Sequence, residues 1–171
     1  DHLSIEDIKK VATKDTVFVA PGEAAAKLGY RNVRSVKPGD RAEESGIRFE
    51  AVAAYNTDKG KLQFHPREKG WVGYVIEAGG KRVYHSGDTD IIDEMKGVEA
   101  DLALIPCGGG YTMDAGEAIS STGIIKAKHF APMHYKALLG REKSRDFEEI
   151  FRREVKNSII MEEILEPFYS L

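Results

Sequence analysis

A nearly all-apolar stretch from Asp101 to Pro106 constrains the fold of this chain most strongly. A strand of this kind is expected where both faces of a sheet are covered. The first half of the chain is richer in predicted strands, and the second half alternates strands with helices. This order favours a layered α/β domain in which helices cover sheets. We therefore expect residues 1–171 to form a single α/β domain.

Apolar runs and turn residues assign several further elements. Strands are predicted at Thr16–Ala20, Val33–Val36, Ile47–Tyr55, Trp71–Glu77, Lys81–Tyr84, Lys128–Pro132 and Ser158–Met161. Helices are predicted just after His2 with Ser4 in a capping box, from Pro21 to Gly29, and at Ile91–Lys96, Asp114–Ala127 and Arg145–Val155. The pair Gly79-Gly80 predicts a hairpin. The polar stretch from Asn56 to Gly70 is long for a loop, which favours a functional role.

The composition bounds the class of protein. The chain is 42% hydrophobic and 31% charged, which is typical of a soluble globular protein. Its net charge of -3 gives no electrostatic reason for nonspecific binding to nucleic acid or membranes. No apolar run approaches the length of a membrane span. The single cysteine, Cys107, rules out an internal disulfide framework and suits a reducing compartment such as the cytoplasm.

The stretch from Lys81 to Asp90 is the most site-like part of the sequence. A predicted strand ends here in a loop that offers one imidazole, His85, and two carboxylates. Gly87 directly precedes Asp88, so the backbone can turn sharply and direct that carboxylate. Catalytic groups are commonly carried on loops at the ends of strands. Asp88 is therefore a candidate functional residue.

Histidines gather at the ends of predicted elements. Four of the five, His2, His65, His85 and His134, lie at or near such ends. Imidazole nitrogens and carboxylate oxygens are the usual ligands of zinc and of several other first-row metals. A single histidine is more often structural, and His129, inside a predicted strand, is interpreted in that way. The other four indicate a metal centre only if they converge with Asp88.

Four segments resemble motifs of one protein family. Asp1–Ser4 is similar to the last half of the H-x-H-x-D-H signature of the metallo-β-lactamase superfamily. Tyr84–Thr89 resembles its Gly-Asp motif, and Pro132–Tyr135 resembles its final histidine motif. Pro106–Asp114 further resembles the ascorbate-6-phosphate-lactonase-like branch of metal-dependent hydrolases. Because all four occur in the family's order, the resemblance covers the chain from its first residue to Tyr135.

The resemblance implies a four-layer αβ/βα sandwich of the metallo-β-lactamase type, with a two-metal site at one edge of the packed sheets. In the family pattern, Asp1, His2, Asp88 and His134 would hold the second metal. Asp88 would also bridge to the first metal. The H-x-H pair for that metal would lie just before Asp1. The resemblance therefore predicts an N-terminal segment, with the first strands, that the sequence given does not contain.

The resemblance also assigns residues around the first metal. Asn56 stands where many relatives carry a histidine, so His65, the histidine available in that loop, is expected to be the third ligand. His85 is expected to orient a ligand or close the site rather than to bind metal. Tyr111 and Thr112 are expected to border the pocket.

The function implied is that of a binuclear metallohydrolase. Two divalent ions, zinc first with manganese or iron as alternatives, would supply a metal-bound hydroxide that cleaves an ester-type bond in a small molecule. The bond could be a lactone, a phosphodiester or a similar linkage. An anionic substrate would suit the glycine-rich loop Gly108–Gly110, whereas Cys107 is expected to be a packed residue rather than a nucleophile.

Two other functions stay open at this point. A non-catalytic, metal-stabilised binding module on the same fold is favoured by Asn56 in place of a common histidine. An iron-dependent redox enzyme is the second alternative. A membrane partner is not expected, a nucleic-acid partner is disfavoured, and the residues give no oligomeric state.

Overall fold

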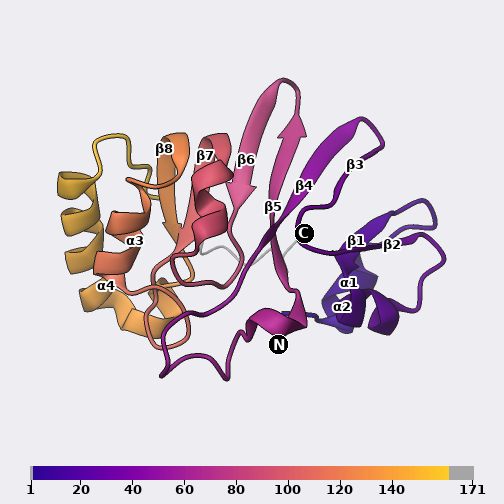
Figure 1. Cartoon of the computed structure of the whole chain (residues 1–171), viewed down its shortest axis with the longest axis horizontal. Helices are drawn as coiled ribbons and strands as arrows, with labels where there is room; N and C mark the ends of the chain where they lie inside the picture. Colours follow the sequence, from indigo (N-terminus) through magenta and orange to yellow (C-terminus); the bar gives the residue numbers. More distant parts are fainter. Residues whose placement is uncertain (1, 162–171) are drawn as a thin grey trace.

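The larger of two β-sheets organises the protein in this computed structural model, which describes residues 2–161 (Figure 1). The sheet has six strands in the order β3-β4-β5-β6-β7-β8. Its strands are β3 (Arg41–Glu44), β4 (Ile47–Ala53), β5 (Val72–Ala78), β6 (Lys81–His85), β7 (Glu99–Pro106) and β8 (Lys126–Met133). Strands β3 to β6 are antiparallel to their neighbours, whereas β6, β7 and β8 run parallel. The sheet is therefore mixed.

Short turns create the antiparallel half. The Gly79-Gly80 pair joins β5 to β6, and both residues have positive φ angles, as a two-residue hairpin turn requires. Ser45-Gly46 makes a similar turn between β3 and β4. The sequence predicts no strand at β3, because its residues are mostly charged and carry no apolar pattern. It forms because β4 offers a free edge beside the Ser45-Gly46 turn.

Crossover connections create the parallel half. The 3-10 helix η2 (Asp93–Gly97) lies between β6 and β7, and α3 (Ala115–Ser121) lies between β7 and β8. Parallel strands present their carboxyl ends at the same edge of a sheet, and ligands bind at that edge in α/β proteins. The loops that follow β6, β7 and β8 therefore leave the sheet side by side.

The first part of the chain forms a smaller unit. Its elements are α1 (Ile5–Val11), β1 (Phe18–Pro21), α2 (Gly22–Leu28) and β2 (Val33–Val36). Strands β1 and β2 pair in parallel as a separate two-stranded sheet. Figure 1 places this sheet beside β3 and away from α3. A small apolar cluster of Val36, Phe49 and Ala51 joins β2 to β4.

A hydrophobic core lies between the larger sheet and the helices packed on it. Tyr84 and Ile105 from the sheet, Met95 from η2 and Phe151 from the last helix are all 0% exposed. Burial of one such side chain contributes about 1.5–3 kcal/mol. This core fixes β6, β7 and β8 relative to one another, and it thereby fixes the loops at their carboxyl ends.

The last helix, α4 (Lys136–Glu154), begins earlier than the predicted Arg145–Val155 helix. It is interrupted at Gly140, whose φ of 73° is not helical. Phe147 and Phe151 are buried on its inner side. Within residues 2–161, no helix is long and apolar enough to cross a membrane.

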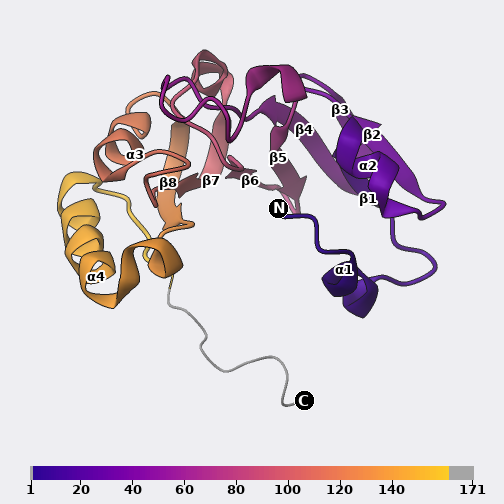
Figure 2. The same cartoon turned by 90° about the horizontal axis from the view of Figure 1, so that it is seen from below.

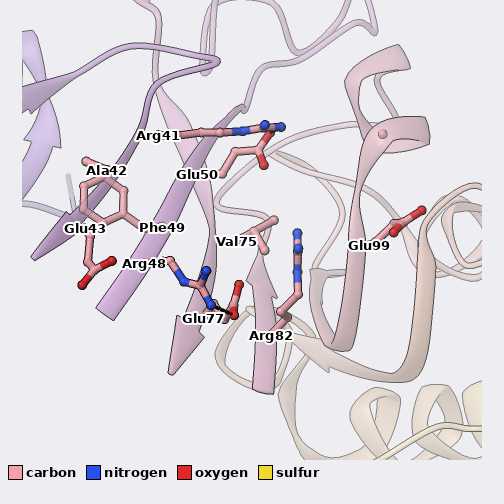
Figure 3. Close-up of a pocket in the computed structure, with 11 residues that line it drawn as sticks. Arg41, Ala42, Glu43, Arg48, Phe49, Glu50, Val75, Glu77, Arg82 and Glu99 are labelled. Carbon is pink, nitrogen blue, oxygen red and sulfur yellow. Dashed lines mark hydrogen bonds and ion pairs between the residues drawn. The ribbon is translucent and has the colours of Figure 1, made fainter. Parts of the chain in front are cut away.

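Charged side chains cover the part of the sheet that the helices leave open (Figure 3). A hollow of about 560 Å³ lies there over β3 to β6. Arg41 pairs with Glu50 at 3.0 Å across β3 and β4, and Arg48 pairs with Glu77 across β4 and β5. Arg82 lines the same hollow. These cross-strand pairs explain why this end of the face lies outside the hydrophobic core.

Besides the last helix, three predicted elements differ in their bounds from the structure. The helix expected at Asp114–Ala127 ends at Ser121, and β8 begins at Lys126. The strand expected at Ser158–Met161 is reduced to one parallel bridge between Phe130 and Ser158. Pro21 caps α2 and ends β1, and it is not the first residue of the helix. Other elements agree within a few residues, including Gly29 as the left-handed end of α2.

The core assignment can be tested with two neighbouring residues of α4. Phe151→Ala is expected to lower the free energy of unfolding by about 3–5 kcal/mol, because it leaves a cavity in the core. Ile150→Ala is the matched control, because Ile150 is 38% exposed, and it is expected to cost only about 0.5 kcal/mol. Urea denaturation measures both. Equal losses would contradict the packing of α4 described above.

Candidate metal centre

Four side chains from distant parts of the chain converge at the carboxyl edge of the parallel strands. Asp88 lies in the loop after β6, and His134 directly follows β8. His2 precedes α1, and His65 lies in the long loop between β4 and η1. The Nε2 atoms of these three histidines each lie 3.5 Å from Asp88 Oδ2. One carboxylate oxygen therefore faces three imidazoles.

These separations fit metal ligands better than hydrogen bonds. At 3.5 Å, each nitrogen–oxygen contact is longer than a good hydrogen bond. Ligands held about 2.0–2.1 Å from a tetrahedral ion lie about 3.3–3.4 Å from one another. His2, Asp88 and His134 each offer a ligand atom, and these atoms lie within 4.8 Å of one another. The donor set is thus suited to one divalent ion.

His65 stands apart from that group of three. Among the residues that the structure describes, it is not a member of the compact cluster of His2, Asp88 and His134. Its Nε2 atom nevertheless reaches the same Asp88 oxygen. The Asp88 carboxylate therefore lies between one pair of imidazoles and a separate third one, which is an arrangement in which a carboxylate can serve two ions.

Asn56 fixes the orientation of His65. His65 Nδ1 lies 2.8 Å from Asn56 Oδ1 and 3.2 Å from the Tyr111 carbonyl oxygen. Both oxygens are acceptors here, so Nδ1 carries the proton and Nε2 keeps its lone pair toward Asp88. The Asn56 amide also donates to the Tyr111 carbonyl at 3.0 Å. Burial lowers the pKa of His65, and the Asp88 carboxylate opposes that shift only in part.

Backbone geometry positions His134. Its φ of 56° is in the left-handed region, which residues other than glycine rarely adopt. Gly108, in the loop after β7, packs against the His134 backbone. A Cβ atom at Gly108 would lie 2.4 Å from the His134 carbonyl oxygen, so only glycine fits there. Held strain of this kind is common at functional sites.

The turn before Asp88 matches the prediction made from Gly87. Gly87 has a φ of 67°, and its amide donates to His85 Nδ1 at 3.2 Å. His85 supports this turn and lies outside the cluster of His2, Asp88 and His134. At the sequence level, His85 is expected to orient a ligand or to close the site. That role stays a prediction.

A buried network behind Asp88 holds the long loop in place. Asp90 is 2% exposed, and its Oδ2 atom accepts the amides of Thr57 at 2.8 Å and Asp58 at 3.0 Å. Lys61 Nζ reaches Asp90 Oδ1 at 3.4 Å and Glu117 Oε2 at 3.1 Å. Burial works to lower the pKa of Lys61, but these carboxylates outweigh burial and the pKa is raised. Lys61 therefore stays charged.

Three of these positioning residues were missed at the sequence level. Asp90, Lys61 and Thr89 carry no assigned role there, although Asp90 follows Asp88 by two residues. Thr89 is fully buried, and its hydroxyl lies 3.2 Å from the Tyr55 amide and 3.0 Å from the Tyr55 carbonyl. The polar stretch from Asn56 to Gly70 is the signal that could have indicated them, because a long polar loop needs buried polar partners to hold it in place.

The other predicted site residues occupy varied positions. Asp1 lies outside the described residues. Tyr111 contacts His65 through its carbonyl oxygen, while its side chain is exposed. Thr112 is fully buried, and its hydroxyl has no hydrogen-bond partner among the described residues. Cys107 is 1% exposed, and burial raises the pKa of its thiol, which agrees with a packed residue rather than a nucleophile.

Comparison with known families identifies the class of protein. A family model described as "Beta-lactamase superfamily domain" matches residues 1–135. The chain belongs to this superfamily, and its fold is of the metallo-β-lactamase type. A solved structure of a proposed metal-dependent hydrolase from Parabacteroides distasonis is similar, with a TM-score of 0.81 and 32% identity. The match covers 93% of this chain and 70% of that one.

Curated relatives carry a consistent description. The chain is 35% identical over 108 residues to a UPF0173 metal-dependent hydrolase of Natranaerobius thermophilus, covering 55% of this chain and 49% of that protein. It is 33% identical over 144 residues to a UPF0173 metal-dependent hydrolase of Thermoplasma acidophilum, covering 79% of this chain and 61% of that protein. The chain thus spans about half the length of the first of these relatives.

The role of Asn56 can be tested by metal affinity. Asn56→Ala is expected to weaken zinc binding by about 10- to 100-fold, because His65 loses the partner that fixes its tautomer. Thr57→Ala is the control, since the exposed Thr57 contributes its backbone amide to the network. Competition with a chromophoric chelator measures the affinities. Unchanged affinity in Asn56→Ala would contradict the role assigned to this amide.

The state of Cys107 can be tested by thiol labelling. Because the pKa of the Cys107 thiol is raised and the side chain is buried, the folded protein is expected to react slowly with an aromatic disulfide reagent at pH 8. Full reaction is expected in denaturant. Fast labelling of the folded protein would show that the thiol is accessible and ionised.

Proposed function

We propose that this chain carries the metal centre of a hydrolase that cleaves an ester-type bond, such as a lactone or a phosphodiester, in a small molecule. The observation that carries the proposal is the single Asp88 oxygen with three imidazole nitrogens at 3.5 Å. The two curated relatives described above are both named metal-dependent hydrolases, and this supports the general class. The substrate and the bond cleaved are inferences of this proposal.

Two ions would share the centre. His2, Asp88 and His134 would hold one of them, together with Asp1 as the family pattern implies. Asp88 and His65 would contribute to the other. Zinc is the first choice for imidazole and carboxylate ligands, and manganese or iron would be accepted because such ligands do not select sharply.

A bound divalent ion supplies a strong nucleophile at neutral pH, by lowering the pKa of water, and polarises the oxygen of the bond under attack. The protein's own contribution is to hold the ligands ready. Asn56 keeps the His65 lone pair directed at the centre. Gly108 lets the loop after β7 pack closely on His134. Asp88 is the carboxylate that His2 and His134 face from one side and His65 from the other.

The metal content of an Asp88 variant tests this proposal. Protein that includes the H-x-H segment expected from the family pattern is predicted to bind about two zinc ions per chain. Asp88→Ala is expected to lose metal because His2, His65 and His134 all face that carboxylate. Asp146→Ala changes an exposed carboxylate on α4 and serves as the control. Mass spectrometry of the metals measures both. Full metal content in Asp88→Ala would refute the arrangement.

Hydrolysis assays separate an enzyme from a binding module. Metal-loaded protein is tested against a panel of simple lactones, carboxylic esters and phosphodiesters, with and without a chelator. Chelator-sensitive hydrolysis supports the proposal. Stable metal binding without hydrolysis of any compound would favour a non-catalytic module, and iron-dependent oxygen consumption would favour redox chemistry.

A further inference from the structure

Lys61 lies where three segments around the metal centre meet. It belongs to the long loop between β4 and η1, which also carries His65. Figures 1 and 2 show this loop lying beside the loop that follows β7. The Lys61 side chain is only 13% exposed, so its ammonium group lies among protein atoms rather than in solvent. A lysine buried to this extent needs partners for its charge.

Each partner of Lys61 belongs to a different part of the site. The Nζ atom lies 3.4 Å from Asp90 Oδ1, in the Gly-Asp loop. It donates to the Thr112 carbonyl oxygen at 2.9 Å, in the loop after β7, and it lies 3.1 Å from Glu117 Oε2 on α3. One ammonium group therefore joins the long loop to the Gly-Asp loop and to the segment that leads into α3.

The contact with Thr112 connects Lys61 to His65. Tyr111 directly precedes Thr112, and its carbonyl oxygen lies 3.2 Å from His65 Nδ1. The Asn56 side-chain amide donates to the same carbonyl. Because Lys61 holds the Thr112 carbonyl, it also holds the neighbouring Tyr111 carbonyl within reach of the imidazole. An acceptor at Nδ1 keeps the Nε2 lone pair free for a metal ion.

The Asp88 side of the centre depends less on Lys61. Asp90 has two backbone amides at its Oδ2 atom that do not involve the lysine. Its own amide donates to the Tyr55 carbonyl at 3.0 Å, and the Thr89 hydroxyl contacts the amide and the carbonyl of Tyr55. These contacts hold the Gly-Asp loop against the residues that follow β4. Loss of the Lys61 ammonium group would therefore loosen the long loop and the segment before α3, and it would leave Asp88 in place.

We propose that Lys61 is a positioning residue for the ion that His65 binds. The ammonium group holds the His65 loop and the Tyr111 carbonyl together, and it thereby sets how firmly the centre binds this ion. The inference rests on the two-ion centre of the proposed function. The other ion depends less on Lys61, because its ligands His2 and His134 precede α1 and follow β8, outside the segments that the lysine joins.

The zinc affinities of Lys61 variants test the inference. The protein used includes the segment upstream of Asp1 with the expected H-x-H pair. Lys61→Met removes the charge and keeps an unbranched side chain, and it is expected to weaken one of the two zinc sites about tenfold while the other stays close to its original affinity. Lys61→Arg keeps the charge and is expected to restore most of the loss. Lys59→Met is the control, because Lys59 is exposed in the same loop. Competition with chromophoric chelators measures the affinities.

Cadmium NMR shows which ion is affected, because each bound ion gives its own resonance. The resonance that Lys61→Met removes or broadens is expected to be the one that Asn56→Ala also changes, whereas His134→Ala is expected to remove the other. Two unchanged affinities in Lys61→Met would overturn the inference. Equal weakening of both ions in the folded variant, or binding of a single ion by the unaltered protein, would overturn it as well.

Glu117→Gln provides a second variant that decides the matter if Lys61→Met does not fold. Glutamine can still complete the capping box of α3 with Asp114, but it gives Lys61 a neutral partner. This variant is expected to weaken the same ion about threefold, as suits the loss of one partly exposed ion pair. No change, or equal weakening of both ions, would overturn the inference.

Hydrolysis assays separate this inference from the proposed function. The activity of Lys61→Met is expected to be low at limiting zinc and to recover in excess zinc, because the variant lacks ion occupancy rather than a group that touches the substrate. Activity that excess zinc does not restore would overturn the inference. Selective loss of one ion in a protein that hydrolyses no ester would keep the inference and refute the proposed function.

Discussion

The parallel pairing of β6, β7 and β8 is the constraint on which the site depends. It brings the carboxyl ends of three strands to one edge, so that the loops carrying Asp88, Gly108 and His134 leave the sheet side by side. The crossovers through η2 and α3 bury a continuous core beneath those loops. The antiparallel strands add width to the sheet, and β4 leads into the loop that carries His65.

That loop has to be anchored, because long polar loops cost conformational entropy when they are ordered. The buried Asp90 carboxylate meets this need by accepting two backbone amides and pairing with Lys61. Lys61 in turn reaches Glu117, which completes the capping box at the start of α3. One network of ion pairs, buried at Asp90, thus connects the loop before η1, the Gly-Asp loop and the helix after β7.

The sequence predicted most of the fold where local and tertiary forces agree. Apolar runs marked most of the strands, and Gly79-Gly80 marked the hairpin between β5 and β6. The predicted helix over Asp114–Ala127 overran its end because Ser121 and Thr122 bond back to the carbonyls of Ala118 and Ile119, which local patterning does not weigh. The partner of His65 was unpredictable for a different reason. Asn56 meets the imidazole only through a nine-residue excursion of the chain.

The two carboxylates of the Gly-Asp loop show how neighbours in sequence acquire different uses. The buried carboxylate of Asp90 has hydrogen-bond donors, since two backbone amides and the Lys61 ammonium donate to it. Asp88 has a side chain only 11% exposed and, among the described residues, has only imidazoles at 3.5 Å around its Oδ2 atom. A nearly buried carboxylate without close donors is costly. A cation bound among those imidazoles would remove this cost. The lone pairs of the imidazole nitrogens, which give Asp88 no hydrogen bond, would then coordinate the ion.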